Sequence, residues 1–230
     1  YPILYRDTRS VFDNNIMKSY VITIESMPES VEAAKRCINS MKEYDVKMFS
    51  AITPDDDPVS IAEEEKIRLD NFKDSRYSRY ERCVSAFLSH YSLWKKCIDD
   101  NEEYQIFEHD AVCTGTLPRF INYQRCVSLG APSYGKFNTP TTLGTSPLVS
   151  KPYFPGAHAY RLNPKGAQEL VMFARGTARP TDIYLNINQF PWLEEYYPWP
   201  VEAKDTFSTI QHEGGCSAKH GYDKKKYKLL

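Results

Sequence analysis

The sequence predicts an α/β, Rossmann-like fold with a mixed, mainly parallel sheet flanked by helices. Residues 19–24 form an apolar run typical of a strand, and residues 45–51 form a second one. Between them, apolar side chains recur with helical spacing. A strand, a helix and a strand in this order and at this spacing indicate a βαβ unit, which makes the two strands parallel.

The first helix is expected to begin at Pro28, because proline suits the first turn of a helix. The second strand ends at residues 53–58, a run of proline and aspartate that breaks regular structure. The apolar positions that define the face of the helix are Val31, Ala34, Ile38 and Met41.

A second helix–strand pair follows a polar stretch, residues 59–82, that reads as a helix or an ordered loop. Residues 83–98 carry an amphipathic helix, and we expect its apolar face to pack on the sheet. Residues 104–107 then form a short buried strand. The helix face consists of Phe87, Tyr91, Trp94 and Ile98.

The second half of the chain contains a long connection, residues 130–156, rich in glycine and proline. Irregular loops of this length in compact domains are usually functional or mobile. A strand at 157–162 and a helix beginning at Asn163 follow it. We therefore expect one catalytic domain at residues 17–215, preceded by an extension of native or added residues at 1–16 and followed by a basic tail at 216–230.

Composition excludes several classes of protein. The chain has 230 residues and a formal net charge of −1, which argues against a wholesale basic nucleic-acid binder. Its six cysteines are scattered without zinc-type spacing, and no stretch approaches the about 20 apolar residues that a membrane span requires. We expect free thiols and a cytoplasmic protein, in the host cytoplasm if the chain is phage-encoded.

An acid-x-acid element follows the buried strand at 104–107. Glu108 and Asp110 flank His109 at the point where the strand ends. Carboxylate oxygens at a strand end suit a hard divalent cation and the diphosphate that it bridges. Both acids could instead simply face solvent at the end of the strand. His109 points away from its neighbours if the pleat persists, so we expect it to be packed rather than to bind a ligand.

Four ordered blocks resemble glycosyltransferase family 25, the lipooligosaccharide and collagen galactosyltransferase group. They are similar to the family's opening strand and "sPeR" turn, its "GcalSH" block, its "LEDDv" block and its "gthaYlis-kGA…pvD" block. Two departures are His109 in place of the middle acid and Cys83 and Val84 in place of the usual glycine context. The "EHDAV" form resembles short phage-encoded members. The matching residues are 19–24 with 28–30, 83–90, 107–112, and 155–160 with 165–167 and 180–182.

The resemblance implies a GT-A fold, a UDP-sugar donor, Mn²⁺ or Mg²⁺, and inversion at the anomeric carbon. Asp110 is then the metal ligand, and Glu108 orients donor hydroxyls or a metal-bound water. A C-terminal histidine, His212 or His220, is a candidate for the third ligand. Ser89 and His90 are further candidates for binding the donor. Adjacent residues on a helix face different directions, so we expect them to brace the end of the sheet beside the donor site rather than to form a nucleophile–base pair.

Inversion requires a general base on the acceptor side, and Asp182 matches the late acid of the family. An aspartate at the start of a helix is equally well explained as an N-cap. The same acid therefore has a catalytic and a structural interpretation.

The acceptor has two interpretations. A saccharide is the default that the family implies. The phage-like "EHDAV" block raises transfer onto a 5-hydroxymethylated pyrimidine of DNA, which needs phosphate contacts and a flipped base. A non-catalytic module that binds nucleotide sugars is the alternative outside enzymes, and the two acids Asp110 and Asp182 argue against it. The candidate acceptor-binding residues are Arg76, Arg79, Arg82 and Tyr160.

Overall fold

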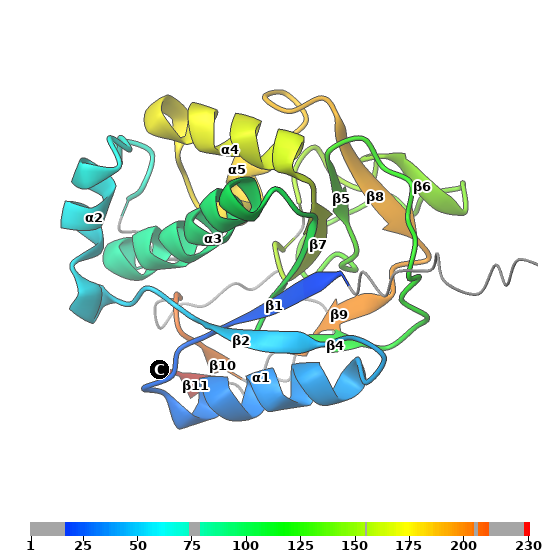
Figure 1. Ribbon diagram of the computed structural model, residues 1–230, viewed down its shortest axis with the longest axis horizontal. Coiled ribbons are helices and arrows are strands. Elements are labelled where there is room, and N and C mark those ends of the chain that lie inside the picture. The colour runs from blue at the N-terminus through cyan, green and yellow to red at the C-terminus, as the bar shows by residue number, and fades with distance from the viewer. Residues whose placement is uncertain (1–16, 74–78, 155, 205–206, 212–227) are drawn as a thin grey trace, which may run out of the picture.

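The computed structural model describes residues 17–73, 79–154, 156–204, 207–211 and 228–230. These residues form a central sheet with helices on both faces, shown in Figure 1. The elements in chain order are β1 (Lys18–Thr23), α1 (Pro28–Ser40), β2 (Val46–Ser50), the 3-10 helix η1 (Pro54–Asp56), α2 (Pro58–Glu64), α3 (Tyr80–Asp100), β3 (Tyr104–Glu108), β4 (Ala111–Cys113), β5 (Cys126–Ser128), β6 (Gly144–Pro147), β7 (Ala159–Leu162), α4 (Pro164–Thr177), α5 (Thr181–Tyr184), β8 (Leu193–Tyr197), β9 (Val201–Ala203), β10 (Phe207–Ser208) and β11 (Lys228–Leu229).

The central sheet has seven strands in the order β2-β1-β3-β7-β5-β8-β6. Strand β1 pairs in parallel with β2 and with β3, and β5 pairs in parallel with β8. Strands β7 and β6 run against their neighbours. Five strands of this sheet, β1, β2, β3, β5 and β8, therefore point the same way. The predicted α/β fold with a mixed sheet is confirmed.

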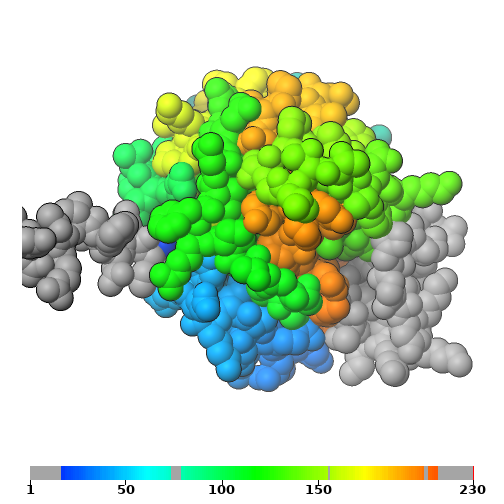
Figure 2. All heavy atoms as spheres, turned by 90° about the vertical axis from the view of Figure 1, so that its right-hand side faces the viewer, coloured from blue at the N-terminus to red at the C-terminus, as the bar shows by residue number. Residues whose placement is uncertain are grey.

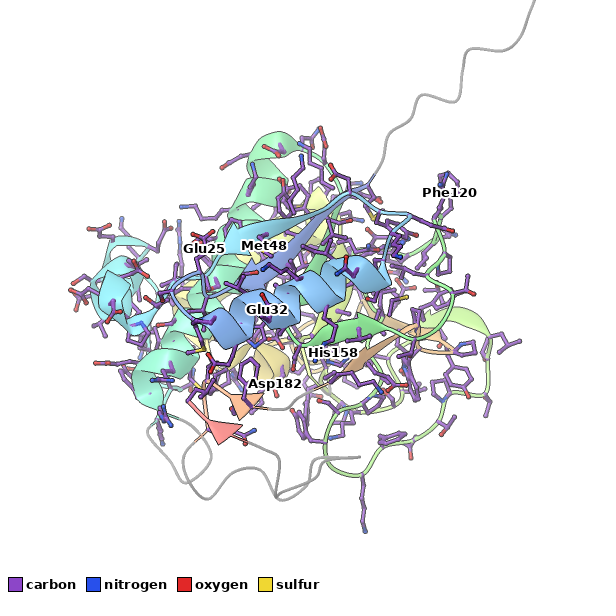
Figure 3. The ribbon with its side chains drawn as sticks, turned by 90° about the horizontal axis from the view of Figure 1, so that it is seen from below. Glu25, Glu32, Met48, Phe120, His158 and Asp182 are labelled. Atoms are coloured by element: carbon purple, nitrogen blue, oxygen red, sulfur yellow. The ribbon has the colours of Figure 1, made fainter. Side chains whose placement is uncertain are left out.

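Alternation along the strands builds two cores, one on each face of the sheet. Val21 and Phe107 pair across β1 and β3 and face α1. Ile22 and Ile106 belong to the opposite core, under α3 and α4. Figure 3, seen from below, shows α1 lying across its own face of the sheet. Because side chains alternate along a strand, Glu108 lies on the same face as Ile106, toward α3.

Helix α3 follows the pattern that its sequence predicts. Phe87, Tyr91 and Trp94 are buried against the sheet, and Ile98 packs at the margin of the same core. The helix ends at Asn101, which adopts the left-handed conformation with φ 51° and lets the chain turn into β3. This short turn fixes the end of β3 relative to the residues on α3.

The long connection at 130–156 differs from the expectation of a wholly irregular segment, because it contains β6. This strand pairs antiparallel with β8 at the edge of the sheet. Figure 2 shows the yellow-green chain of the connection against the orange chain of the region that holds β8 and β9. The glycine and proline at the ends of Gly144–Pro147 are typical of loops, so the sequence does not indicate this strand, which forms by backbone pairing with β8.

Two expectations from composition can be compared with the described residues. Cys37, Cys97, Cys113 and Cys126 are free thiols, as predicted, and Cys216 lies outside the described residues. Among the helices that the structure describes, each is too short or too polar to cross a bilayer.

Candidate active site

The candidate site lies at the carboxyl end of the parallel strands. Strand β1 ends beside β3, with Ile22 opposite Glu108, and a turn at His109 and Asp110 leads into β4. Open α/β sheets bind ligands at this edge, because neighbouring strands end there and release their loops in the same direction. The acid-x-acid element is thus placed where a ligand can reach several loops at once.

Glu108 is held by a chain of buried side chains. His90 Nε2 lies 3.2 Å from Glu108 Oε1, and His90 Nδ1 lies 2.8 Å from the Tyr160 hydroxyl. Trp94 Nε1 donates to the same hydroxyl at 2.8 Å. His90 is 1% exposed and Tyr160 is fully buried, so water does not compete for these bonds.

The hydrogen-bond partners of His90 determine its tautomer. The Glu108 carboxylate accepts, so His90 Nε2 carries the proton and Nδ1 is left as an acceptor. The Tyr160 hydroxyl then accepts from Trp94 and donates to His90. A protonated His90 would leave the Tyr160 proton without an acceptor in the core, which costs free energy. The neutral tautomer satisfies all four groups and fixes the orientation of Glu108.

Asp110 presents a buried oxygen that lacks a hydrogen bond. Its Oδ1 atom has no partner among the described residues, whereas its backbone carbonyl accepts from Lys204 N at 2.8 Å. Burial raises the pKa of the Cys37 thiol well above its usual value, and the nearby Asp110 carboxylate adds to this shift. A buried, unsatisfied carboxylate oxygen is costly unless a cation or a donor completes it.

His109 is packed between α1 and the chain after β9. Its Nδ1 atom lies 3.0 Å from Ser30 Oγ, which also accepts from Ile24 N at 2.9 Å. Its ring stacks on Phe207 with centroids 5.2 Å apart. The side chain fastens the turn to the start of α1, in agreement with the expectation that it is packed.

Asp182 enters the site from the other half of the chain, in the first turn of α5. Its Oδ2 atom accepts a short hydrogen bond from the Tyr134 hydroxyl, and its Oδ1 atom accepts from Ile183 N at 2.9 Å. The N-cap of α5 is Pro180, so Asp182 does not have the structural role of a cap. Its side chain is half-buried.

The surroundings of Asp182 change its pKa in opposing ways. Burial raises the pKa of Asp182, and the Glu108 carboxylate raises it further. The hydrogen bonds from Tyr134 and Ile183 act in the opposite direction and favour the ionised form. A carboxylate with a raised pKa and an oriented hydrogen bond is suited to accept a proton.

Three of the predicted contacts with substrate are corrected by burial. Tyr160 is fully buried and its hydroxyl is bonded to His90 and Trp94, so it supports Glu108 and does not face an acceptor. Ser89 is fully buried, and its hydroxyl accepts from Ile52 N at 2.9 Å and donates to the Ser85 carbonyl at 2.8 Å. Ser89 and His90 brace this edge of the sheet without contacting a donor directly.

The arginine cluster is also placed differently from the prediction. Arg79 Nη1 donates to the Leu230 carbonyl at 2.7 Å, and Arg82 Nη1 donates to the Leu230 and Thr209 carbonyls at 2.5 and 2.9 Å. These guanidinium groups hold the end of the chain rather than an open groove. Arg76, His212 and His220 lie outside the described residues.

Sequence reasoning missed two residues near the site, Tyr134 and His158. Tyr134 comes from the long connection, whose length indicated a functional loop without indicating which residue matters. His158, labelled with Asp182 in Figure 3, is 1% exposed, and its backbone carbonyl accepts from Glu108 N at 3.0 Å. Neither of its ring nitrogens has a partner among the described residues.

The described residues hold no group of three or more histidine, cysteine, aspartate or glutamate side chains that could enclose a metal ion. The buried Oδ1 atom of Asp110, which has no partner among these residues, has the chemistry of a ligand for a hard cation.

The fold places the acids Glu108 and Asp110 at the ends of the parallel strands, the edge where open α/β sheets bind ligands. The sequence model of Glycosyltransferase family 25 (LPS biosynthesis protein) matches residues 16–126. Residues 16–126 thus match this family, and the resemblance inferred from the motifs is confirmed. The match runs from β1 to the first residue of β5 and includes Glu108 and Asp110, while Asp182 lies beyond it. A comparison with curated proteins finds no match.

Proposed function

We propose that this chain is an inverting glycosyltransferase that moves a sugar from a UDP-sugar to a hydroxyl group of a saccharide. The observation that supports this most strongly is the meeting of two chemical groups at one edge of the sheet. Glu108 and Asp110 come from the family 25 part of the chain, and Asp182 comes from the other half. Acids with separate surroundings can take separate roles in one reaction.

Asp110 and Glu108 are the residues that would hold a divalent cation, Mn²⁺ or Mg²⁺. When bound, such a cation neutralises the negative charge that develops on a diphosphate leaving group. The buried Oδ1 atom of Asp110 would contribute a ligand to it, since this atom has no other partner among the described residues. The relay from Trp94 through His90 holds Glu108 ready to orient donor hydroxyls or a metal-bound water.

Asp182 is the general base in this proposal. The acceptor oxygen forms a bond to the anomeric carbon of the donor while the bond from that carbon to the UDP oxygen breaks. The proton of the acceptor hydroxyl passes to the Asp182 carboxylate, and UDP leaves from the opposite face of the sugar. Tyr134 orients the carboxylate through its hydrogen bond to Oδ2.

The test is a transfer assay with a panel of UDP-sugars and saccharide acceptors, in which UDP release and product mass are both measured. Asp182→Asn should retain donor affinity and lose on the order of a hundred-fold or more in turnover. Asp99→Asn on the exposed surface of α3 is the matched control and should behave as the wild type. If the wild-type chain binds UDP-sugars but turns none over, it is a binding module and the proposal is rejected.

A further inference from the structure

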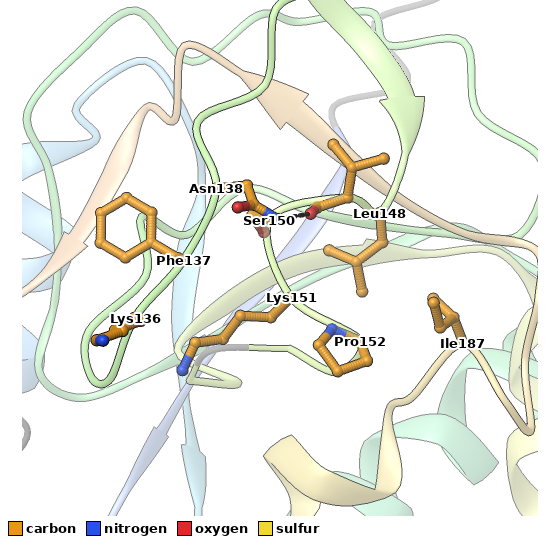
Figure 4. Close-up of a pocket in the computed structure, with 9 residues that line it drawn as sticks. Lys136, Phe137, Asn138, Leu148, Ser150, Lys151, Pro152 and Ile187 are labelled. Atoms are coloured by element: carbon orange, nitrogen blue, oxygen red, sulfur yellow. Dashed lines mark hydrogen bonds between the residues drawn. The ribbon is translucent and has the colours of Figure 1, made fainter.

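A pocket of about 660 Å³ opens beside the long connection, as the close-up in Figure 4 shows. One part of its wall is apolar and another carries amines. The residues that line it are Lys136, Phe137, Asn138, Leu148, Val149, Ser150, Lys151, Pro152 and Ile187. The family match ends before all of these residues, at residue 126.

The pocket has a positive end. Lys136 is exposed. The preceding residue, Gly135, lies so close to the Lys151 amine that a Cβ atom at Gly135 would be 2.8 Å from Lys151 Nζ. Lys136 therefore follows directly after a residue that contacts Lys151. None of the described residues that line the pocket is acidic. Two ammonium groups on one wall favour a ligand that carries negative charge.

Lys151 connects this end of the pocket to the candidate base. Its Nζ atom donates to the Tyr134 carbonyl at 2.6 Å and lies 4.3 Å from the centroid of the Tyr134 ring. The hydroxyl of the same ring donates to Asp182. One tyrosine side chain therefore separates the positive end of the pocket from the proposed general base, on the acceptor side of the reaction.

The apolar wall is held firmly enough to bind a ligand. The buried Glu195 carboxylate accepts from Val149 N and Ser150 N, each at 2.7 Å, and from Trp199 Nε1 at 3.0 Å. The Trp199 ring in turn packs edge-on against Phe137, with centroids 5.8 Å apart. An exposed aromatic face beside polar groups is a surface on which a sugar ring can stack.

From this arrangement we infer that the pocket is a subsite for an acidic saccharide, whose carboxylate or other anionic group lies at the exposed amine of Lys136, with the buried ammonium of Lys151 adding positive charge behind it. The inference rests on the proposed function, which requires a saccharide next to Asp182. It specifies the class of acceptor: the sugar next to the reacting hydroxyl carries negative charge. Phe137 and the apolar wall contact the faces of the sugar rings.

The test measures binding first, without a donor. Calorimetry compares an oligosaccharide that contains glucuronic acid with the same oligosaccharide after reduction of its carboxyl group. The full chain should bind the acidic form at least about tenfold more tightly, a difference of about 1.4 kcal/mol. Lys136→Ala should remove most of this preference, and Lys165→Ala, which removes an exposed amine on α4, should leave it unchanged.

Equal affinity for the acidic and reduced forms, or a preference that survives Lys136→Ala, overturns the inference. Tighter binding of a short DNA duplex than of the acidic saccharide, with the same dependence on Lys136, also overturns it and favours a nucleic acid acceptor. Transfer is measured separately. If the acidic saccharide binds through Lys136 but receives a sugar from none of the UDP-sugars, the proposed function is rejected and the inferred subsite is still supported.

Discussion

Removal of one oxygen atom from Tyr160 should destabilise the protein. In Tyr160→Phe, the indole N–H of Trp94 and the Nδ1 atom of His90 both lose their partner inside the core. Each buried polar group left without a partner costs about 1–3 kcal/mol, so the pair costs about 2–6 kcal/mol. At about 2–4 °C per kcal/mol for a chain of this size, the melting temperature should fall by at least about 4 °C.

A matched substitution exists at Tyr104→Phe. The Tyr104 ring is also buried in the sheet, but its hydroxyl donates to Asp100 at 2.5 Å, and Asp100 keeps its contact with Lys18 at 2.8 Å in the variant. The expected loss is about 1 kcal/mol, the net contribution of one hydrogen bond whose partner stays satisfied. Urea unfolding of both variants at neutral pH gives the comparison.

Tyr160→Phe also tests whether Tyr160 supports Glu108 or contacts the substrate. If Tyr160 acts through His90 and Glu108, Tyr160→Phe lowers kcat together with stability, because Glu108 loses its fixed orientation. A loss of stability below about 1 kcal/mol, with a raised KM for the acceptor and an unchanged kcat, would refute this reasoning. Tyr160 would then contact the acceptor, as its sequence position first suggested.

Three further predictions concern the ends of the strands and the long connection. Asp110→Asn should weaken binding of UDP in the presence of Mn²⁺ and leave metal-free binding unchanged, as followed by calorimetry with and without EDTA. The general base must be ionised, and the pKa of Asp182 is raised, so activity should decline with falling pH already above the usual pKa range of aspartate. Tyr134→Phe removes a hydrogen bond that lowers this pKa. The decline in activity should then begin at a still higher pH. Gly135→Ala should cost more stability than Gly144→Ala in urea unfolding, because both glycines have positive φ but only Gly135 lies against a side chain.

Local pattern predicted much of the fold. The βαβ unit and the apolar face of α3 depend on periodicity, which the chain carries in Phe87, Tyr91 and Trp94. Strand β6 could not be predicted, because its four residues form a strand through backbone bonds to β8. Edge strands of this kind have no side-chain signature.

Local pattern also located the acids of the site and could not identify their supports. Glu108 and Asp110 follow a buried strand, so their position was readable. The bond between Tyr134 and Asp182 joins residues 48 positions apart and depends on how the long connection folds back. Tyr160 and the arginines were assigned to the acceptor because residue type does not reveal burial or the partner that a guanidinium finds.

Charged groups are satisfied differently in the core and at the strand ends. Arg161 is a fully buried cation, and it is paired with Gln105 Oε1 at 2.7 Å and with the Pro118 carbonyl at 2.5 Å. At the strand ends, by contrast, Asp110 Oδ1 has no partner among the described residues, and Asp182 is held beside another carboxylate. Because its pKa is raised in the folded state, ionised Asp182 opposes folding above the usual pKa of aspartate. Asp182→Asn should therefore increase stability at neutral pH while it lowers turnover, as expected where an ionised group serves function at the expense of the fold.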